Sequence, residues 1–276
     1  MAIKGVNMKI TFIGGGNMGE AMLSAIIEKR IAKTKDIIVS DISEPRRHFL
    51  EQKYTILTTS DNQLAISDAN IIVLAIKPQT LPIVIYELKN KIKPSQLIIS
   101  IITGKTISAL RGGLIHDRIV RSMPNTPAQI REGVTVWTAT REVTTTQKKQ
   151  AALILGAMGR QFYVEDERFL DMATAVSGSG PAYLFYFVES FIEAAVAIGW
   201  DRSMAKELVL NTVLGAAQLL KQSNREPADL RRMVTSPGGT TAEAVRVFDE
   251  GKLVELITKA VKAAYEKAQL LGRSPS

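Results

Sequence analysis

The stretch Lys9–Glu20, KITFIGGGNMGE, decides the fold of this 276-residue chain. It joins a short apolar run to a glycine-rich turn, and helical spacing begins within it at Met18, over MGEAMLSAII. Gly14, Gly16 and Gly19 fit the pattern G-x-G-x-x-G between strand and helix. There, the first glycine permits a tight turn, the second lets backbone N–H groups approach a pyrophosphate, and the third lets the helix pack on the strand. The stretch therefore predicts dinucleotide binding, rather than a glycine-rich turn without a ligand.

The same alternation of strands and helices continues to about residue 164. Apolar, β-branched runs predict strands at Lys9–Ile13, Ile37–Ser40, Ile71–Ile76, Leu97–Ile102, Arg118–Ser122, 133–139 and 160–164. Helical spacing lies between them at Met18–Lys29, Pro45–Lys53, Asp61–Ile66 and Thr145–Gly156. The runs IIVLAI and LIISII are apolar on consecutive residues, as in strands buried on both faces. We expect an α/β domain over residues 1–164, with a Rossmann-like, doubly wound sheet.

The pattern changes to helices alone from about Phe169 onward. Glycine and proline punctuate the helical segments Pro181–Ile198, Arg202–Lys221, Pro227–Met233, Thr241–Glu250 and Leu253–Leu271. We therefore expect a second, all-helical domain over residues 165–276.

Composition excludes several kinds of site. The chain has no cysteine and two histidines, which excludes a disulfide framework, a thiolate nucleophile and His-rich or Cys-ligated metal sites. Its apolar runs are too short to span a membrane. Glycines and an asparagine, rather than a cleavage pattern, follow the N-terminal apolar stretch, which predicts a strand and a loop. We expect no metal, no membrane partner and a cytoplasmic location.

The net charge of +8 comes from 35 Lys and Arg against 27 Asp and Glu. Such a charge suits nucleic acid, but it also suits an enzyme that handles anionic cofactors and substrates. The basic residues are scattered, with only short pairs such as Arg46-Arg47, Lys148-Lys149 and Arg231-Arg232. We therefore expect a small-molecule substrate and no nucleic acid.

Two signals at the end of the second predicted strand conflict over the cofactor. Ser40-Asp41 places an acid where it would accept a hydrogen bond from the ribose 2′-hydroxyl of NAD. Arg46 and Arg47 follow, and arginine can hold the 2′-phosphate of NADP, although both could equally form a solvated helix face. We favour NADP and leave NAD open.

Four further loops carry polar or flexible residues. Ala75-Ile76-Lys77-Pro78 lies at the C-terminal end of a predicted strand, at the edge of the sheet where ligands bind. Arg121–Pro127, RSMPNTP, either presents the Asn125 amide or forms a rigid turn. Ser177–Tyr183, SGSGPAY, has Pro181 at an early helical position and suits either an anion site or a helix cap, of which we favour the structural role. Thr235–Thr241, TSPGGTT, precedes a helix and suits either a carboxylate site or a helix cap.

Five of these motifs occur in the order and spacing of one family. IGGGNMG, LAIKPQ, RSMPNTP, SGSGPAY and SPGGTT together resemble the pyrroline-5-carboxylate reductases, and the resemblance covers residues 8–272. It implies NAD(P)H-dependent reduction of the cyclic imine pyrroline-5-carboxylate to L-proline, the last step of proline biosynthesis. It also implies a Rossmann domain followed by a helical domain that intertwines with a second subunit, in a homodimer or larger homo-oligomer.

The resemblance also assigns roles to residues. It implies a pyrophosphate site at Ile13, Gly14, Gly15, Gly16, Asn17 and Met18, and an adenosine contact at Asn62. It implies that Ala75, Ile76, Lys77, Pro78, Ile101, Ile102, Thr103 and Asn125 lie on the nicotinamide side. Ser236, Gly238, Gly239, Thr240 and Thr241 match the substrate-carboxylate loop, with Thr241 at the substrate-nitrogen position as the catalytic candidate. Asp41 stands at a position where many NADP-using members of the family carry a small hydroxyl residue, and this difference bears on the cofactor preference.

Two alternatives remain. A 3-hydroxyacid dehydrogenase of similar architecture relies on a lysine in a helical G-x-x-x-K segment, but the helix after Gly180, PAYLFYFVESF, has none. A dinucleotide-binding scaffold without catalysis, or a nucleic-acid binder, is the alternative from another class.

Overall fold

The computed structural model describes residues 8–273, and the outermost residues of both expected domains lie outside this range. The chain divides into two compact units. One contains the described residues up to Ser179 together with those from Ala264 onward, and the other is Gly180–Ala263. The expected boundary at residues 164/165 stays a prediction.

The described residues of the first unit form an eight-stranded sheet in the order β3-β2-β1-β4-β5-β6-β7-β8. The strands are β1 (Ile10–Ile13), β2 (Ile37–Ser40), β3 (Leu57–Thr59), β4 (Ile71–Leu74), β5 (Leu97–Ser100), β6 (Ile119–Met123), β7 (Gly133–Ala139) and β8 (Gly159–Tyr163). β1 pairs in parallel with both β2 and β4, so the chain winds outward from it in two directions. This confirms the predicted doubly wound sheet. The sequence did not locate β3, and β7 runs antiparallel to β6.

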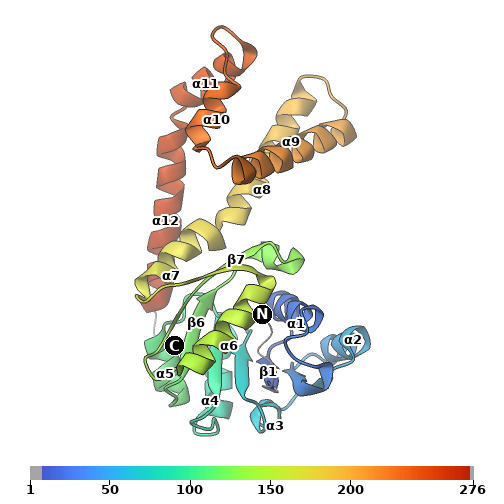
Figure 1. Cartoon of the computed structure of the whole chain (residues 1–276), viewed down its shortest axis with the longest axis vertical. Coiled ribbons are helices and arrows are strands. Elements are labelled where there is room, and N and C mark those ends of the chain that lie inside the picture. Colours follow the sequence, from blue (N-terminus) through green and yellow to red (C-terminus); the bar gives the residue numbers. More distant parts are fainter. Residues whose placement is uncertain (1–7, 274–276) are drawn as a thin grey trace. The chain divides into compact units, whose positions relative to one another are not determined.

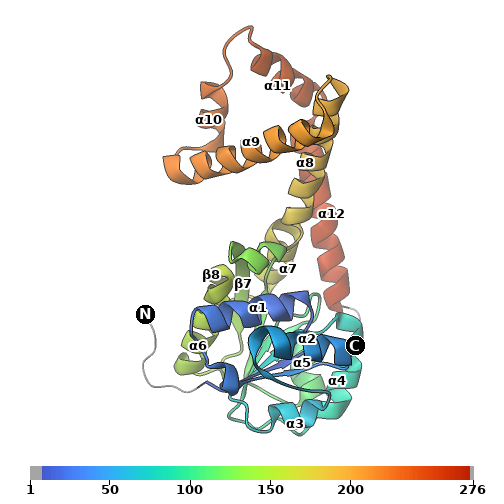
Figure 2. The same cartoon turned by 90° about the vertical axis from the view of Figure 1, so that its right-hand side faces the viewer.

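Helices cover both faces of this sheet (Figures 1 and 2). One face packs against α1 (Asn17–Glu28), α2 (Glu44–Tyr54) and α6 (Thr145–Leu155), and the other against α3 (Asn62–Ile66), α4 (Leu81–Leu88) and α5 (Ile107–Leu114). Ile71 and Val73 of β4 belong to the first core cluster, and Ile72 and Leu74 to the second. Because successive strand residues point to opposite faces, a strand between two helical layers must be apolar throughout.

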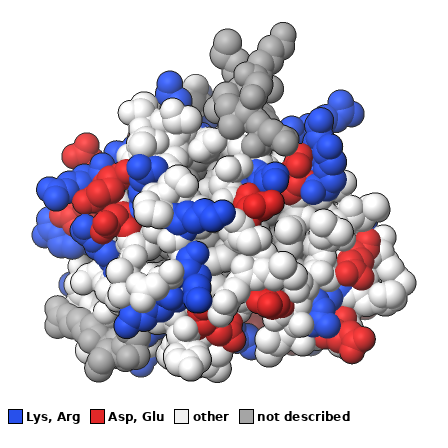
Figure 3. Space-filling model, turned by 90° about the horizontal axis from the view of Figure 1, so that it is seen from below, with Lys and Arg blue, Asp and Glu red and all other residues white. Residues whose placement is uncertain are grey.

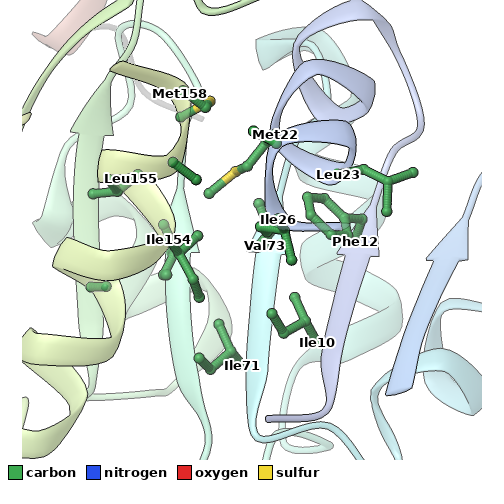
Figure 4. Close-up of a cluster of buried hydrophobic side chains, with 14 of the residues drawn as sticks. Ile10, Phe12, Met22, Leu23, Ile26, Ile71, Val73, Ile154, Leu155 and Met158 are labelled. Carbon is green, nitrogen blue, oxygen red and sulfur yellow. The ribbon is translucent and has the colours of Figure 1, made fainter. Parts of the chain in front are cut away.

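The core on the α1 face brings together segments that are far apart in the sequence. Figure 4 shows Met22 and Ile26 of α1 and Ile154 of α6 lying over the side chains of β1 and β4. Phe12 of β1 is completely buried in this cluster. This packing fixes α1, and with it the glycine turn, against the sheet.

The remaining described α-helices and a π-helix follow the first unit's last strand. They are α7 (Arg168–Ala173), a π-helix (Thr174–Gly178), α8 (Gly180–Ala197), α9 (Arg202–Ser223), α10 (Pro227–Met233), α11 (Thr240–Glu250) and α12 (Leu253–Arg273). The five long helical segments expected from the sequence are thus confirmed to within two residues. A side-chain cap marks the start of α9, because the Asp201 side chain accepts a hydrogen bond from the Met204 N–H at the N-terminus of this helix.

Buried His116 should make the stability of the first unit depend on pH. Its Nε2 lies 2.9 Å from the Gln96 carbonyl oxygen, and burial lowers its pKa. The unfolded chain therefore takes up a proton at this group more readily than the folded chain, and stability falls as pH drops below the unfolded pKa of about 6.5. We expect a lower free energy of unfolding at about pH 5.5 than at about pH 7.5, by at most about 1.4 kcal/mol per pH unit for one proton.

Urea denaturation at the two pH values measures this difference. His48 is a matched control, because its side chain is 68% exposed. His48→Gln should keep the pH dependence, whereas His116→Gln should reduce it. Equal loss of the dependence in both variants would contradict the assignment to His116.

Candidate active site

A cavity of about 210 Å³ lies at the carboxyl ends of β1, β2 and β4. Its lining consists of Ile13, Gly14, Gly16, Ser40, Asp41, Ile42, Asn62, Ala75, Ile76, Lys77, Thr80 and Val84. Neighbouring strands lead away from β1 in opposite directions here, which is where open α/β sheets bind ligands. The structure therefore brings predicted residues from four separate segments into one cleft.

The three motif glycines face different surroundings. Gly14 has φ +97°, and a Cβ there would lie 2.6 Å from the Ala75 carbonyl oxygen. A Cβ at Gly19 would lie 2.8 Å from the Gly14 carbonyl oxygen, but at Gly16 it would meet no atom within 4 Å. The protein's own packing thus explains the first and third glycines. Gly16 borders open space in the cleft, as a residue approached by a ligand would.

The N-terminus of α1 lies at this open position. Gly16 is the N-cap residue, with extended backbone angles, and no described side chain caps the helix. The first N–H groups of a helix need partners, and the helix dipole makes them attractive to an anion. The geometry suits a phosphate group.

Asp41 connects the cleft to the glycine turn. Its Oδ2 accepts a hydrogen bond from the Gly15 N–H at 2.8 Å, and its Oδ1 accepts one from the Ser43 N–H at 2.9 Å. A carboxylate has about four acceptor positions, so both oxygens retain capacity for a further donor. Asp41 can therefore hold the turn and also accept a hydrogen bond from a sugar hydroxyl in the cleft.

Arg46 and Arg47 are both engaged within the protein. The Nε of Arg46 donates to the Gly15 carbonyl oxygen at 2.5 Å, and its guanidinium forms an ion pair with Glu20. Arg47 donates to the Asp41 carbonyl oxygen at 2.7 Å. Neither side chain contributes to the described cavity lining. The two arginines tie α2 to the loops at the ends of β1 and β2.

Glu20 is the centre of a polar cluster on the outer side of α1. Besides Arg46, its carboxylate accepts hydrogen bonds from Lys53 and from the Tyr54 hydroxyl, each at 2.8 Å. Burial raises the pKa of Glu20, but the hydrogen bonds from Lys53, Arg46 and Tyr54 outweigh that effect and lower it to about 2. Glu20 is therefore ionised at neutral pH.

Asn62 is oriented by a carboxylate on the neighbouring helix. Its Nδ2 donates to Oε2 of Glu87 at 2.6 Å. Because an ionised carboxylate only accepts, the amide nitrogen must face Glu87. The Oδ1 atom and the second N–H of Asn62 remain for a ligand in the cleft.

The residues predicted on the nicotinamide side are divided. Ala75, Ile76 and Lys77 line the cavity, and Pro78 begins the short 3-10 helix Pro78–Thr80 directly after them. Ile101 and Ile102 are buried, and the Oγ1 of exposed Thr103 lies 3.9 Å from the Met123 sulfur. The structure does not bring Ile101, Ile102, Thr103 or Asn125 into this lining, and the same is true of Gly15, Asn17, Met18, Arg46 and Pro78.

The amide of Asn125 binds the protein itself. Its Nδ2 donates to the Ser177 carbonyl oxygen at 3.0 Å, and its Oδ1 accepts from the Val134 N–H at 2.8 Å. The contact with Ser177 joins the RSMPNTP loop to the π-helix Thr174–Gly178. In the same region, Arg121 is buried and forms ion pairs with Glu167 and Asp171. The geometry favours the rigid-turn interpretation for this loop.

The SPGGTT loop lies in the second unit. The Gly239 N–H donates to the Ser236 carbonyl oxygen at 3.0 Å, and Gly238 has φ +71°, so Pro237 and Gly238 occupy the central positions of a type II turn. Gly239 then caps α11 with its backbone, and no described side chain caps this helix. A Cβ on Gly239 would lie 2.6 Å from the Ser236 hydroxyl oxygen. The turn thus holds a hydroxyl beside an uncapped helix N-terminus, an arrangement that suits a carboxylate.

Three cavity residues were missed by the sequence analysis, namely Ile42, Thr80 and Val84. Ile42 is 87% exposed directly after Asp41. An isolated apolar residue after a strand-end acid is the signal that would have found it, because an exposed isoleucine offers an apolar contact to a base. Thr80 and Val84 carry no comparable signal, since their place depends on how α4 packs.

The doubly wound sheet and the open glycine turn at its switch point define a dinucleotide-binding protein of the Rossmann type. Residues 9–104 match the family model described as NADP oxidoreductase, coenzyme F420-dependent. Residues 167–271 match the model for pyrroline-5-carboxylate reductase dimerisation. The chain is therefore a pyridine-nucleotide oxidoreductase with a C-terminal dimerisation domain.

Similar proteins extend this assignment over nearly the whole chain. A pyrroline-5-carboxylate reductase of Synechocystis is 37% identical over 268 residues, covering 97% of this chain and 100% of the relative. The structure of such a reductase from Coxiella burnetii has a TM-score of 0.89 at 37% identity, covering 98% of this chain and 100% of that chain. A pyrroline carboxylate reductase of Plasmodium falciparum with NADP bound has a TM-score of 0.87 at 32% identity, covering 96% and 98%. The chain belongs to the pyrroline-5-carboxylate reductase family.

Within residues 8–273, no helix is long and apolar enough to cross a membrane. The same residues contain no group of three or more His, Asp or Glu side chains placed to hold a metal ion.

Proposed function

We propose that this chain reduces pyrroline-5-carboxylate to L-proline with NAD(P)H. The observation that supports this most directly is the open cleft beside Gly16 and Asp41, in a chain whose similarity to these reductases spans both compact units. The cleft suits a dinucleotide, and we infer the substrate from the family to which the chain belongs.

The cofactor would be held by the turn and by the strand ends around it. Ile13–Met18 would bind the pyrophosphate, Asp41 a ribose hydroxyl and Asn62 the adenosine side. Ala75–Pro78, Ile101–Thr103 and Asn125 would border the nicotinamide, which supplies the hydride. Ile101, Ile102 and Asn125 are buried, so their contribution would come from the shape of the pocket wall and from backbone groups.

The substrate would be held by the loop of the second unit. Ser236 and the backbone N–H groups of Gly239–Thr241 would bind its carboxylate, and the Thr241 hydroxyl would hydrogen-bond the ring nitrogen. A protonated imine accepts hydride readily, so the reaction needs positioning more than a strong side-chain acid. Both histidines lie outside the predicted site, with His116 buried against Gln96.

The preference for NADPH stays a prediction. Arg46 is held by Glu20 and Gly15 and does not contribute to the described cavity lining, whereas Asp41 already lies in the cleft. NADH therefore remains open as a cofactor.

We also propose a homodimer, or a larger homo-oligomer, in which the helices of the second unit interlock. The large apolar surface of this unit supports the proposal, because no residue of α8, α10 or α11 is buried. Phe185 and Tyr186 of α8 are 63% and 72% exposed. Soluble proteins rarely leave large contiguous apolar patches uncovered. The cytoplasmic location expected from the sequence stays a prediction.

The proposed activity is tested by mixing the protein with synthetic pyrroline-5-carboxylate and NADPH or NADH. We expect substrate-dependent oxidation of the dinucleotide, and proline as the product. A gel shift on nucleic acid at several salt concentrations tests the alternative that the protein binds nucleic acid. On the face seen in Figure 3, Lys and Arg lie beside Asp and Glu with broad uncharged areas between them, which favours the enzyme. Nucleic-acid binding with no dinucleotide oxidation would overturn the proposal.

A further inference from the structure

We infer that Glu20 is a specificity-determining residue, which restrains Arg46 and so weakens the preference for a dinucleotide with a 2′-phosphate. The inference rests on the proposed dinucleotide site and assigns Glu20 a role in choosing its ligand. Glu20 acts as a positioning residue, because it would act on the ligand through Arg46.

Arg46 is held on two sides at the edge of the glycine turn. Its Nε donates to the Gly15 carbonyl oxygen, and its guanidinium pairs with Glu20. The side chains of Arg46 and Glu20 are only 24% and 17% exposed. Arg46 also lies over the Phe49 ring, with its guanidinium carbon 5.0 Å from the ring centroid. The guanidinium is thus fixed by a carboxylate, a carbonyl and an aromatic ring.

The N–H donors that Arg46 gives to Gly15 and Glu20 are not available to a phosphate at the same time. The planar fork of N–H donors on a guanidinium matches carboxylate and phosphate in the same geometry, so the two anions compete for it. Glu20 is a strong competitor, because it is partly buried and is also held by Lys53 and Tyr54. A 2′-phosphate that takes the Nη2 donor of Arg46 would displace Glu20 and leave this carboxylate with fewer partners.

The free 2′-hydroxyl faces no such competition. Asp41 lines the cleft and can accept a hydrogen bond from a hydroxyl, while its charge repels a phosphate. The Asp41 carboxylate is itself anchored by the Gly15 N–H, next to the carbonyl oxygen that receives Arg46. One residue, Gly15, therefore positions both groups that bear on the 2′ position.

The test compares two ligands that differ only at the 2′ position, 2′,5′-ADP and 5′-AMP. Isothermal titration calorimetry on the intact protein gives both dissociation constants. We expect Glu20→Gln to shift the affinity ratio toward 2′,5′-ADP by about five-fold, because a neutral amide oxygen competes less strongly for the guanidinium than a carboxylate does. In the double variant Glu20→Gln/Arg46→Ala this gain should disappear.

Control variants separate this role from general electrostatics and from structural damage. Glu51→Gln also removes a negative charge, in this case from α2. The Glu51 carboxylate accepts a hydrogen bond from the Thr58 hydroxyl and does not bind Arg46. This variant should leave the ratio unchanged. Glu20→Asp, which shortens the reach by one methylene, should shift the ratio in the same direction as Glu20→Gln. An unchanged ratio in both Glu20 variants, or a gain that persists without Arg46, would overturn the inference. Since the assay measures binding alone, failure of the proposed reduction would be seen separately.

Discussion

Gly16→Ala is expected to fold as stably as the parent chain and to bind the dinucleotide at least about ten-fold more weakly. Gly16 has backbone angles that alanine adopts without strain, and a Cβ there would meet no protein atom within 4 Å. The added methyl group would occupy the space through which a pyrophosphate reaches the first N–H groups of α1. Urea denaturation and calorimetric titration with the oxidised cofactor measure the two quantities.

Gly14→Ala provides the matched comparison within the same turn. With φ at +97° and the Ala75 carbonyl oxygen 2.6 Å from the new Cβ, this change should lower the free energy of unfolding by about 2 kcal/mol or more. If Gly16→Ala had normal stability and an unaltered cofactor affinity, this turn would be excluded as the pyrophosphate site.

Thr241→Ala is expected to lower kcat by about one hundred-fold while leaving the dissociation constant of NADPH unchanged. Thr241 lies in the first turn of α11, next to the Ser236–Gly239 turn, and we propose that its hydroxyl binds the ring nitrogen of the substrate. Losing this hydrogen bond would leave the imine poorly oriented when hydride is transferred.

Thr241→Ser keeps the hydroxyl and should recover most of the lost rate. Single-turnover kinetics with saturating NADPH would separate hydride transfer from product release. Full activity in Thr241→Ala would exclude the hydroxyl from the mechanism, even if the surrounding loop still bound the carboxylate.

Much of the first unit could be predicted because its signals are local. Three glycines at fixed spacing mark the turn, and fully apolar runs such as Ile71–Leu74 mark strands covered on both faces. β3 escaped because its sequence is only LTT, too short and polar to stand out. α4 and α5 were not located either. The first, LPIVIYEL, is apolar on consecutive residues, and the second, ISALRGGL, contains two glycines.

Other features depend on contacts between distant segments. The π-helix Thr174–Gly178 is stabilised by the Asn125 amide, 52 residues before Ser177. The sequence predicted Arg46 as a candidate cation for the 2′ position, but its partner Glu20 lies 26 residues earlier, on another helix. A cation's position can be inferred from spacing, whereas its pairing requires the fold.

The last helix also limits how the chain can be cut. The described residues from Ala264 onward belong to the nucleotide-binding unit, where Ala268 is buried and Leu271 packs on Gly104. A fragment that ends at Ser179 would therefore lack the part of α12 that packs on this unit, although it contains every strand of the described sheet. The C-terminal segment of the chain thus packs in the unit that is synthesised first. Protease cleavage or premature termination near the carboxyl end would therefore destabilise the nucleotide-binding unit.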